Sequence, residues 1–209
     1  MTDATFWTRG ARRYSERPVP DEDAYAETLS RTAHHLHRED RMLELGCGTG
    51  MTALRLAPHV AHLTAIDYAQ GMIDIAREKA WEASVRNVAF EVAEPGADAL
   101  LGQRFDVVAA FNLLHLMPDP RAALAHVARY LEPGGLFISK TPCLAGLGLR
   151  SGFYRAIVMS MRAVGFAPAV TFFSVRDWHA MIDAAGFEII ERGTYPSGGT
   201  SRFVVARLR

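Results

Sequence analysis

A glycine-rich turn at residues 46–50 constrains the fold of this chain more than any other feature. The sequence GCGTG follows a short apolar run, and it places glycine at every second position. Glycine adopts backbone dihedral angles that are closed to other residues, and it lets a ligand approach the main chain without meeting a Cβ atom. A helical pattern follows at residues 51–57. The pattern therefore predicts a buried strand that turns sharply into a helix with free backbone amides at its start.

The next apolar run ends in an acidic residue. Residues 63–66 form this run, and Asp67 follows it. In a parallel sheet, Asp67 would lie beside the glycine turn, where it could accept hydrogen bonds from a ribose diol. Two cofactor classes use this arrangement. The dinucleotide fingerprint needs glycine or alanine three residues after its second glycine, whereas this chain has Met51 there.

The pattern E-x-G-x-G-x-G that begins at Glu44 resembles the first motif of class I S-adenosylmethionine-dependent methyltransferases. Three later stretches are also similar to this family: FDVV at the start of the run 105–111, NLLHLMPDP at 112–120 and LEPGG at 131–135. The resemblance covers nearly the whole chain and is densest over residues 42–140. The chain looks most similar to the quinone-biosynthesis type and related small-molecule methyltransferases.

This resemblance implies an α/β fold with a Rossmann-like, doubly wound sheet. The expected sheet has seven strands in the order 3-2-1-4-5-7-6, and only the seventh is antiparallel. We expect one domain over residues 1–209, which divides into an N-terminal helical cap (1–40), a cofactor-binding core (41–141), a lid-like insertion after the fifth strand (142–174), and a C-terminal helix and hairpin (175–209).

The resemblance also implies a site for S-adenosyl-L-methionine, whose product is S-adenosyl-L-homocysteine. The expected cofactor-binding residues come from five places along the chain: Tyr14; Glu44, Gly46, Cys47 and Gly48; Asp67, Tyr68 and Met72; Glu94 and Pro95; and Asn112. Two of them depart from the family pattern. Relatives usually carry aspartate where Glu94 stands, and Pro95 has no backbone amide to donate, so it offers only apolar contact.

His115 is the best candidate for a general base on the substrate side. An imidazole accepts a proton near neutrality, and a base is needed only if the attacking atom must lose a proton. The alternative is a packed or substrate-contacting histidine without a role in proton transfer. Weaker candidates for the base are Tyr14, Tyr154, His179 and Tyr195.

Residues 1–40 are expected to be helical. Pro20 and Asp21 supply a helix start signal, and an apolar face is predicted from helical spacing at Tyr25, Leu29, Thr32, Ala33 and Leu36. Three histidines end this segment: His34, His35 and His37. Neighbouring positions on a helix point in different directions, so three such side chains cannot bind one ion. We predict a solvated helix end and no metal site.

Composition narrows the function further. Lysine plus arginine and aspartate plus glutamate balance at 23 each, so there is no electrostatic reason to expect a nucleic-acid partner. Cys47 and Cys143 lack paired spacing, and we expect two buried, reduced thiols. No stretch has the length of a membrane span, and the N-terminus has no apolar signal core, so a cytoplasmic location is expected. The oligomeric state stays open.

The expected function is methyl transfer from S-adenosylmethionine to an O, N, S or C atom of a small-molecule acceptor. The neutral charge and the apolar insertion favour an acceptor that is itself partly apolar. Two alternatives stay open. The chain could bind S-adenosylmethionine or its product as a sensor or structural ligand, or it could be a nicotinamide-dependent oxidoreductase, against which Met51 argues.

Overall fold

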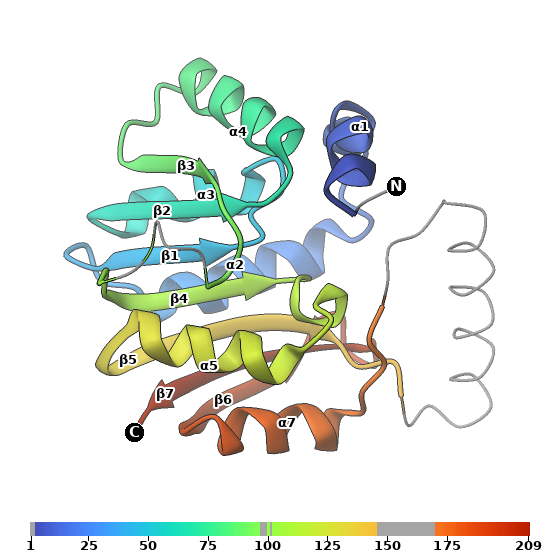
Figure 1. Ribbon diagram of the computed structural model, residues 1–209, viewed down its shortest axis with the longest axis vertical. Coiled ribbons are helices and arrows are strands. Elements are labelled where there is room, and N and C mark those ends of the chain that lie inside the picture. The colour runs from blue at the N-terminus through green and yellow to red at the C-terminus, as the bar shows by residue number, and fades with distance from the viewer. Residues whose placement is uncertain (1–2, 97–99, 101, 146–169) are drawn as a thin grey trace.

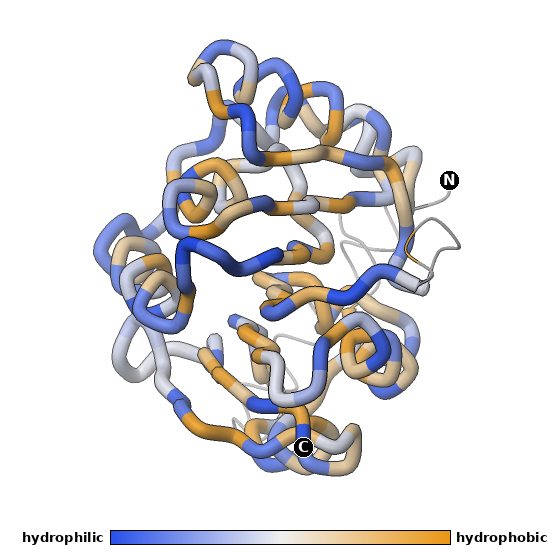
Figure 2. Tube along the Cα trace, turned by 90° about the vertical axis from the view of Figure 1, so that its left-hand side faces the viewer, coloured by the Kyte–Doolittle hydropathy of each residue, from blue (hydrophilic) through white to orange (hydrophobic). Residues whose placement is uncertain are grey.

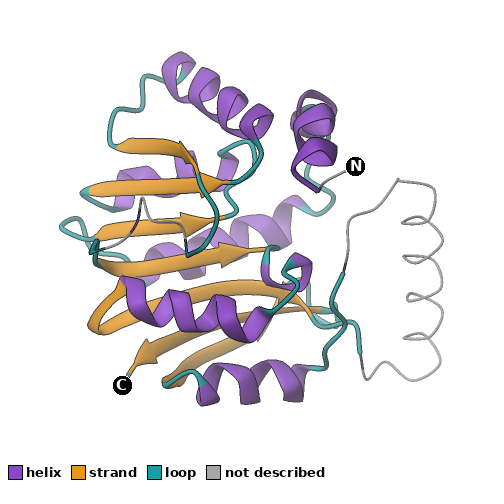
Figure 3. Ribbon diagram, viewed as in Figure 1, coloured by secondary structure: helices purple, strands orange, loops and turns teal. Residues whose placement is uncertain are grey.

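The structure is a computed structural model that describes residues 3–96, 100, 102–145 and 170–209. Helices cover both faces of one central sheet (Figures 1 and 3). The elements are α1 (Asp3–Ser15), α2 (Glu22–His34), β1 (Arg41–Leu45), α3 (Met51–Leu56), η1 (Ala57–His59), β2 (His62–Asp67), α4 (Gln70–Glu82), β3 (Val88–Val92), β4 (Phe105–Phe111), η3 (Leu114–Leu116), α5 (Pro120–Tyr130), β5 (Leu131–Pro142), α7 (Val175–Ala184), β6 (Phe187–Thr194) and β7 (Ser201–Leu208).

The sheet topology confirms the prediction. Among the described residues the sheet has seven strands in the order β3-β2-β1-β4-β5-β7-β6. β7 runs antiparallel to both β5 and β6, whereas the other neighbouring strands pair in parallel. The carboxyl ends of β1, β2, β3 and β4 therefore meet at one edge, which is the edge where ligands bind in open α/β sheets.

Each face of the sheet has its own hydrophobic core. β1 contributes to both, because successive side chains of a strand point to opposite faces. Leu43 packs in the core beneath α5 and α7, and Met42 packs in the core beneath α3 and α4; both side chains are fully buried. Figure 2 shows the hydrophobic segments concentrated along the inner strands. None of the described helices is long and apolar enough to cross a membrane.

The proline and glycines of the LEPGG stretch would be expected to end a helix and reverse the chain. In the structure the stretch instead forms part of a strand. α5 ends at Tyr130, and β5 begins at Leu131, which pairs with Phe105 of β4. The register then shifts, so that Val107 pairs with Leu136. The intervening residues form a bulge, where a proline without an N–H group does not interrupt the ladder.

The inward face of α2 includes Leu29 and Thr32, as predicted, and Leu36 packs just beyond the helix, but two of the most buried positions of α2 were not foreseen. Its buried residues are Ala24, Thr28 and Thr32, whereas Tyr25 and Leu29 are only partly buried. The threonine hydroxyls donate to the carbonyls one turn earlier: Thr28 to Ala24 at 2.6 Å and Thr32 to Thr28 at 2.8 Å. These bonds satisfy the hydroxyls within the helix, so hydroxyl-bearing residues can occupy a buried face.

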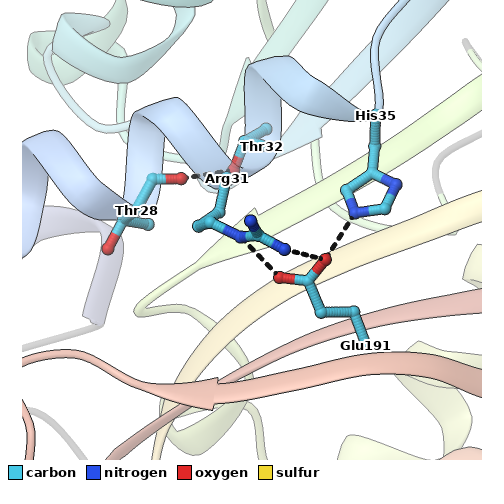
Figure 4. A network of polar contacts seen from close by, with 5 residues as sticks. All are labelled: Thr28, Arg31, Thr32, His35 and Glu191. Atoms are coloured by element: carbon cyan, nitrogen blue, oxygen red, sulfur yellow. Dashed lines mark hydrogen bonds and ion pairs between the residues drawn. The ribbon is translucent and has the colours of Figure 1, made fainter.

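His34 and His37 at the end of α2 are exposed, as predicted, whereas His35 is tied to the sheet, which corrects the prediction for that residue. His35 Nε2 lies 2.7 Å from Glu191 Oε2 on β6, and Arg31 donates to both oxygens of the same carboxylate (Figure 4). His37 pairs with Asp40, its Nδ1 lying 3.6 Å from Oδ2. The described residues contain no group of His, Cys, Asp and Glu side chains that could hold a metal ion.

We expect Glu191→Gln to lower the free energy of unfolding by about 1 kcal/mol at pH 7, because the partly exposed carboxylate loses its charge-assisted bonds to Arg31. The Arg31 hydrogen bond lowers the pKa of Glu191 below its ordinary value of 4.5. The stabilisation is therefore present above pH 4.5 and is lost as the pH falls through the folded-state pKa. Urea denaturation at pH 7 and below pH 4 measures both effects. Glu188→Gln, at an exposed position of the same strand, is the control and should change neither.

Both cysteines are free and buried, as predicted. Cys47 lies in the glycine turn with 7% of its surface exposed, and Cys143 follows β5 with 2% exposed. Burial raises the pKa of both thiols. Because the thiolate is the reactive form, neither group is activated as a nucleophile.

Candidate functional site

A cavity of about 970 Å³ opens where β1, β2, β3 and β4 end. Every residue that the sequence placed in the site lines it: Tyr14, Glu44, Gly46, Cys47, Gly48, Asp67, Tyr68, Met72, Glu94, Pro95, Asn112 and His115. These residues span a hundred positions in sequence, and the strand order brings them together. Their individual roles stay predictions.

The glycine turn presents its backbone to the cavity. Gly48 and Gly50 have φ values of +53° and +76°, in the left-handed region that favours glycine. A Cβ at Gly50 would lie 2.8 Å from Ala76 and Phe90, so this glycine permits close packing of the turn on α4 and β3. A Cβ at Gly48 would meet only the Tyr14 ring, at 3.9 Å. The Tyr14 ring therefore lies close over the backbone of the turn at Gly48.

Asp67 ends β2 beside this turn, as predicted. Its Oδ2 accepts a hydrogen bond from the Gly48 amide at 3.0 Å, and its Oδ1 accepts one from the Ala69 amide at 2.9 Å. Burial raises the pKa of Asp67, and the two backbone hydrogen bonds oppose that rise. A carboxylate oxygen has a second lone pair, so each oxygen can accept one further donor from the cavity.

Glu44 places a second acidic side chain in the cavity wall. It is 2% exposed, and its Oε2 has no hydrogen-bond partner among the described residues. Burial, assisted by the nearby Asp67, raises the pKa of Glu44 to about 8. The side chain is thus mostly protonated at neutral pH, and a cation in the cavity would favour its ionised form.

Asn112 occupies the first position after β4 in a strained conformation. Its φ is +54°, which asparagine tolerates better than most residues. Its backbone N–H donates to the Lys140 carbonyl at 2.8 Å. The Lys140 side chain donates in turn to Thr28 of α2 at 3.0 Å. Lys140 therefore connects the end of β4 with the helix that precedes the sheet.

His115 lies in η3, on the part of the cavity beyond Asn112. Its Nδ1 is buried and has no hydrogen-bond partner among the described residues. Burial lowers the pKa of His115 from 6.5 to about 4. The imidazole is therefore neutral at physiological pH and has a free nitrogen with which to accept or donate a hydrogen bond.

Thr171, near the end of the predicted insertion, holds the η3 loop in place. The Thr171 amide donates to the His115 carbonyl at 2.6 Å, and the Thr171 hydroxyl donates to the Met117 carbonyl at 3.0 Å. Pro142 and Val170, which lie on either side of residues 146–169, both line the cavity. The lid predicted for residues 142–174 falls largely on 146–169, and these residues, with the candidate base Tyr154, lie outside the described residues.

Of the other candidate bases within the described residues, one lies at the cavity and two do not. Tyr14 lines the cavity, whereas His179 on α7 and Tyr195 after β6 do not. His179 is partly buried, and burial together with Arg202 and Arg192 lowers its pKa. Tyr195 packs against Phe203, with ring centroids 5.7 Å apart. Neither residue is placed to act on a molecule in the cavity.

The N-terminal segment contributes more to the cavity than Tyr14, the one residue of this segment that the sequence placed there. Trp7 of α1, Arg17 of the linker and Tyr25 of α2 all line the cavity. The Tyr25 hydroxyl lies 3.2 Å from Thr52 Oγ1, and burial is the largest cause that raises its pKa. Helical spacing placed Tyr25 on the apolar face of α2. The hydroxyl group of Tyr25, at a position predicted to face inward, was the only sign in the sequence that this residue reaches a polar site.

This chain is similar in sequence to known methyltransferases. The family described as "Methyltransferase domain" matches residues 16–192. The uncharacterized methyltransferase YcgJ of Bacillus subtilis is 30% identical over 138 residues, which cover 66% of this chain and 54% of that protein. The ubiquinone biosynthesis O-methyltransferase of Xylella fastidiosa is 37% identical over 103 residues, covering 47% and 41% of the two chains.

Solved structures agree on the fold. Magnesium protoporphyrin IX methyltransferase from Synechocystis PCC 6803, solved with bound SAH, has a TM-score of 0.71 at 19% identity, and the match covers 98% of this chain and 94% of that chain. The chain spans about half the length of the curated relatives it matches.

Proposed function

The chain belongs to the class I S-adenosylmethionine-dependent methyltransferase family, and from this premise we propose that it methylates a small molecule. S-adenosylmethionine is the proposed methyl donor. The proposed acceptor is a small, partly apolar molecule with an O, N, S or C nucleophile. The proposed reaction is an in-line displacement that leaves S-adenosylhomocysteine.

One observation carries this proposal. The glycine turn, the acid at the end of β2 and the residues after β3 and β4 line a single cavity, and Asp67 is already bonded to the Gly48 amide at 3.0 Å. An Asp67 side chain fixed in this way has two lone pairs left for the hydroxyls of a ribose. The fit of the cofactor is supported by the unpartnered Glu44 Oε2, which would meet a cationic group of the ligand.

When bound, the cofactor supplies a methyl group activated by a sulfonium, so the protein must mainly position the acceptor and exclude water. Correct orientation alone can supply roughly 7 to 11 kcal/mol. The cavity suits this task, since its lining includes the apolar side chains of Phe111, Leu116 and Met117. We propose that neutral His115 orients the acceptor there and takes its proton when the nucleophile carries one.

Calorimetric titration of the purified chain with S-adenosylmethionine, S-adenosylhomocysteine and NADH tests the proposal. We expect both adenosyl sulfur ligands to bind and NADH not to bind. Binding of NADH alone would contradict the proposed function. Binding of the sulfur ligands without turnover of any acceptor in a broad panel of small hydroxyl, amine and thiol compounds would favour the non-catalytic alternative.

Glu44 gives a specific signature of cofactor binding. Because its pKa is about 8 in the free protein, a cationic ligand is expected to release up to one proton when it binds at pH 7. The apparent affinity should therefore rise with pH and level off above about pH 8. Titration with S-adenosylhomocysteine in buffers of different ionisation enthalpy measures the proton count.

Glu44→Gln is the matched variant, because it keeps the shape of the side chain and removes its titration. We expect it to bind S-adenosylhomocysteine about tenfold more weakly at pH 8, from the loss of one charge-assisted contact, and to release no proton. An unchanged proton count in Glu44→Gln would show that another group titrates.

A further inference from the structure

Helix α1 is joined to the rest of the molecule along α4. Ala11 packs with Ala69, Met72 and Ile75, and Trp7 covers the same cluster. Arg12 forms an ion pair with Glu78 of α4 at 3.1 Å, with both side chains largely exposed. Figure 1 shows α1 standing beside the start of α4, at the edge where the strands end. We call this contact the α1–α4 seam.

A glycine makes this seam possible. Gly71, in the first turn of α4, lies against the backbone of α1, and a Cβ there would be 2.7 Å from the Thr8 carbonyl oxygen and 3.2 Å from the Thr8 Cα. Distances below 3.0 Å to a backbone atom cannot be relieved by a side-chain rotation. Any side chain at position 71 would therefore push α1 away from α4.

The seam places aromatic side chains at the cavity. Trp7 and Tyr14 line the cavity, and their rings meet edge to face with centroids 5.9 Å apart. Met72 belongs both to the seam and to the cavity wall. The Tyr14 ring also covers Gly48. A shift of α1 relative to α4 would therefore move Trp7 and Tyr14 at the cavity, whereas the glycine turn and Asp67 belong to other elements.

We propose that Gly71 is a positioning residue for cofactor binding: it contacts no ligand, and it sets the affinity of the cavity by letting α1 dock on α4. This inference rests on the proposed function for the identity of the ligand. It predicts that a substitution at position 71 weakens ligand binding and leaves the stability of the sheet unchanged.

The chain offers a matched pair of variants. Gly71→Ala adds a methyl group against the Thr8 backbone, whereas Gly10→Ala adds one on α1 where no atom lies within 4 Å. Both substitutions raise helix propensity. We expect Gly71→Ala to weaken S-adenosylhomocysteine binding about tenfold and to speed hydrogen exchange of the α1 amides in the free protein. Gly10→Ala should bind at least as tightly as the wild type and slow that exchange.

The amide exchange of the central strands separates positioning from a general structural role, and it should be unchanged in both variants. Wild-type affinity in Gly71→Ala, equal effects of the two variants, or faster exchange throughout the sheet would each overturn the inference. The exchange measurement needs no ligand. If the wild type itself fails to bind S-adenosylhomocysteine, the proposed function fails, while the exchange of α1 still decides whether Gly71 docks the helix.

Discussion

Asp67→Ala is expected to weaken binding of S-adenosylhomocysteine at least a hundredfold. The wild-type carboxylate holds the Gly48 and Ala69 amides at 3.0 and 2.9 Å and, in the proposed function, also accepts the ribose hydroxyls. Loss of two hydrogen bonds to a charged group corresponds to about 3 kcal/mol, or about a hundredfold in the dissociation constant. The affinity of Asp67→Asn should lie between those of the wild type and Asp67→Ala. The side-chain oxygen of asparagine can still accept a hydrogen bond, whereas its amide nitrogen cannot accept one from a backbone N–H. Calorimetric titration measures both.

A loss of affinity must be separated from a loss of structure. Asp106 provides the control, because its Oδ2 accepts a hydrogen bond from the Arg41 amide at 2.8 Å at the start of β1, far from the cavity. Asp106→Ala removes a comparable carboxylate-to-backbone bond and should leave the affinity unchanged. Wild-type affinity in Asp67→Ala would contradict the placement of the ribose, and equal losses in the two variants would attribute the effect to folding.

The sheet was predictable because its signals are local. The glycine turn requires positive φ angles, and the glycines at alternate positions of the sequence indicate them. Asp67 ends β2, directly after its buried apolar residues. The strand order was predicted from the family resemblance, and the observed topology confirms that order. The environment of His35 was not predictable, because it depends on a contact distant in sequence. His35 is held by Glu191, which lies 156 residues away, and periodicity within α2 contains no trace of that partner.

The same reasoning explains which part of the cavity was foreseen. The residues after β1, β2, β3 and β4 are placed by strand register, so each could be assigned from its position at the end of an apolar run. Trp7, Arg17 and Tyr25 reach the cavity only because α1 and α2 pack where they do. That packing depends on close approach at Gly71 and on the Lys140 bond to Thr28, neither of which has a sequence pattern.

His115→Ala is expected to lower kcat about a hundredfold, the lower range for loss of a general base, while the dissociation constant of S-adenosylhomocysteine changes less than threefold. His115 lies beyond the predicted cofactor residues, so its loss should affect the acceptor step. His115→Gln keeps a hydrogen-bonding side chain and cannot take a proton, so kcat should stay low if His115 is a base and recover if it only orients the acceptor. Steady-state kinetics with an identified acceptor measure this split.

The pH dependence gives an independent test of the same role. Burial lowers the pKa of His115 to about 4, so its neutral, proton-accepting form persists as the pH falls and is lost only through about pH 4. Saturating S-adenosylmethionine removes the effect of Glu44 on cofactor binding, and under that condition the acidic limb of kcat/KM for the acceptor should lie well below pH 6.5. His179→Ala removes another partly buried histidine whose pKa is lowered, away from the cavity, and should leave rate and profile unchanged. Wild-type turnover in His115→Ala would exclude the base assignment, and proton transfer would then fall to the acceptor's own ionisation, with the cavity acting through orientation alone.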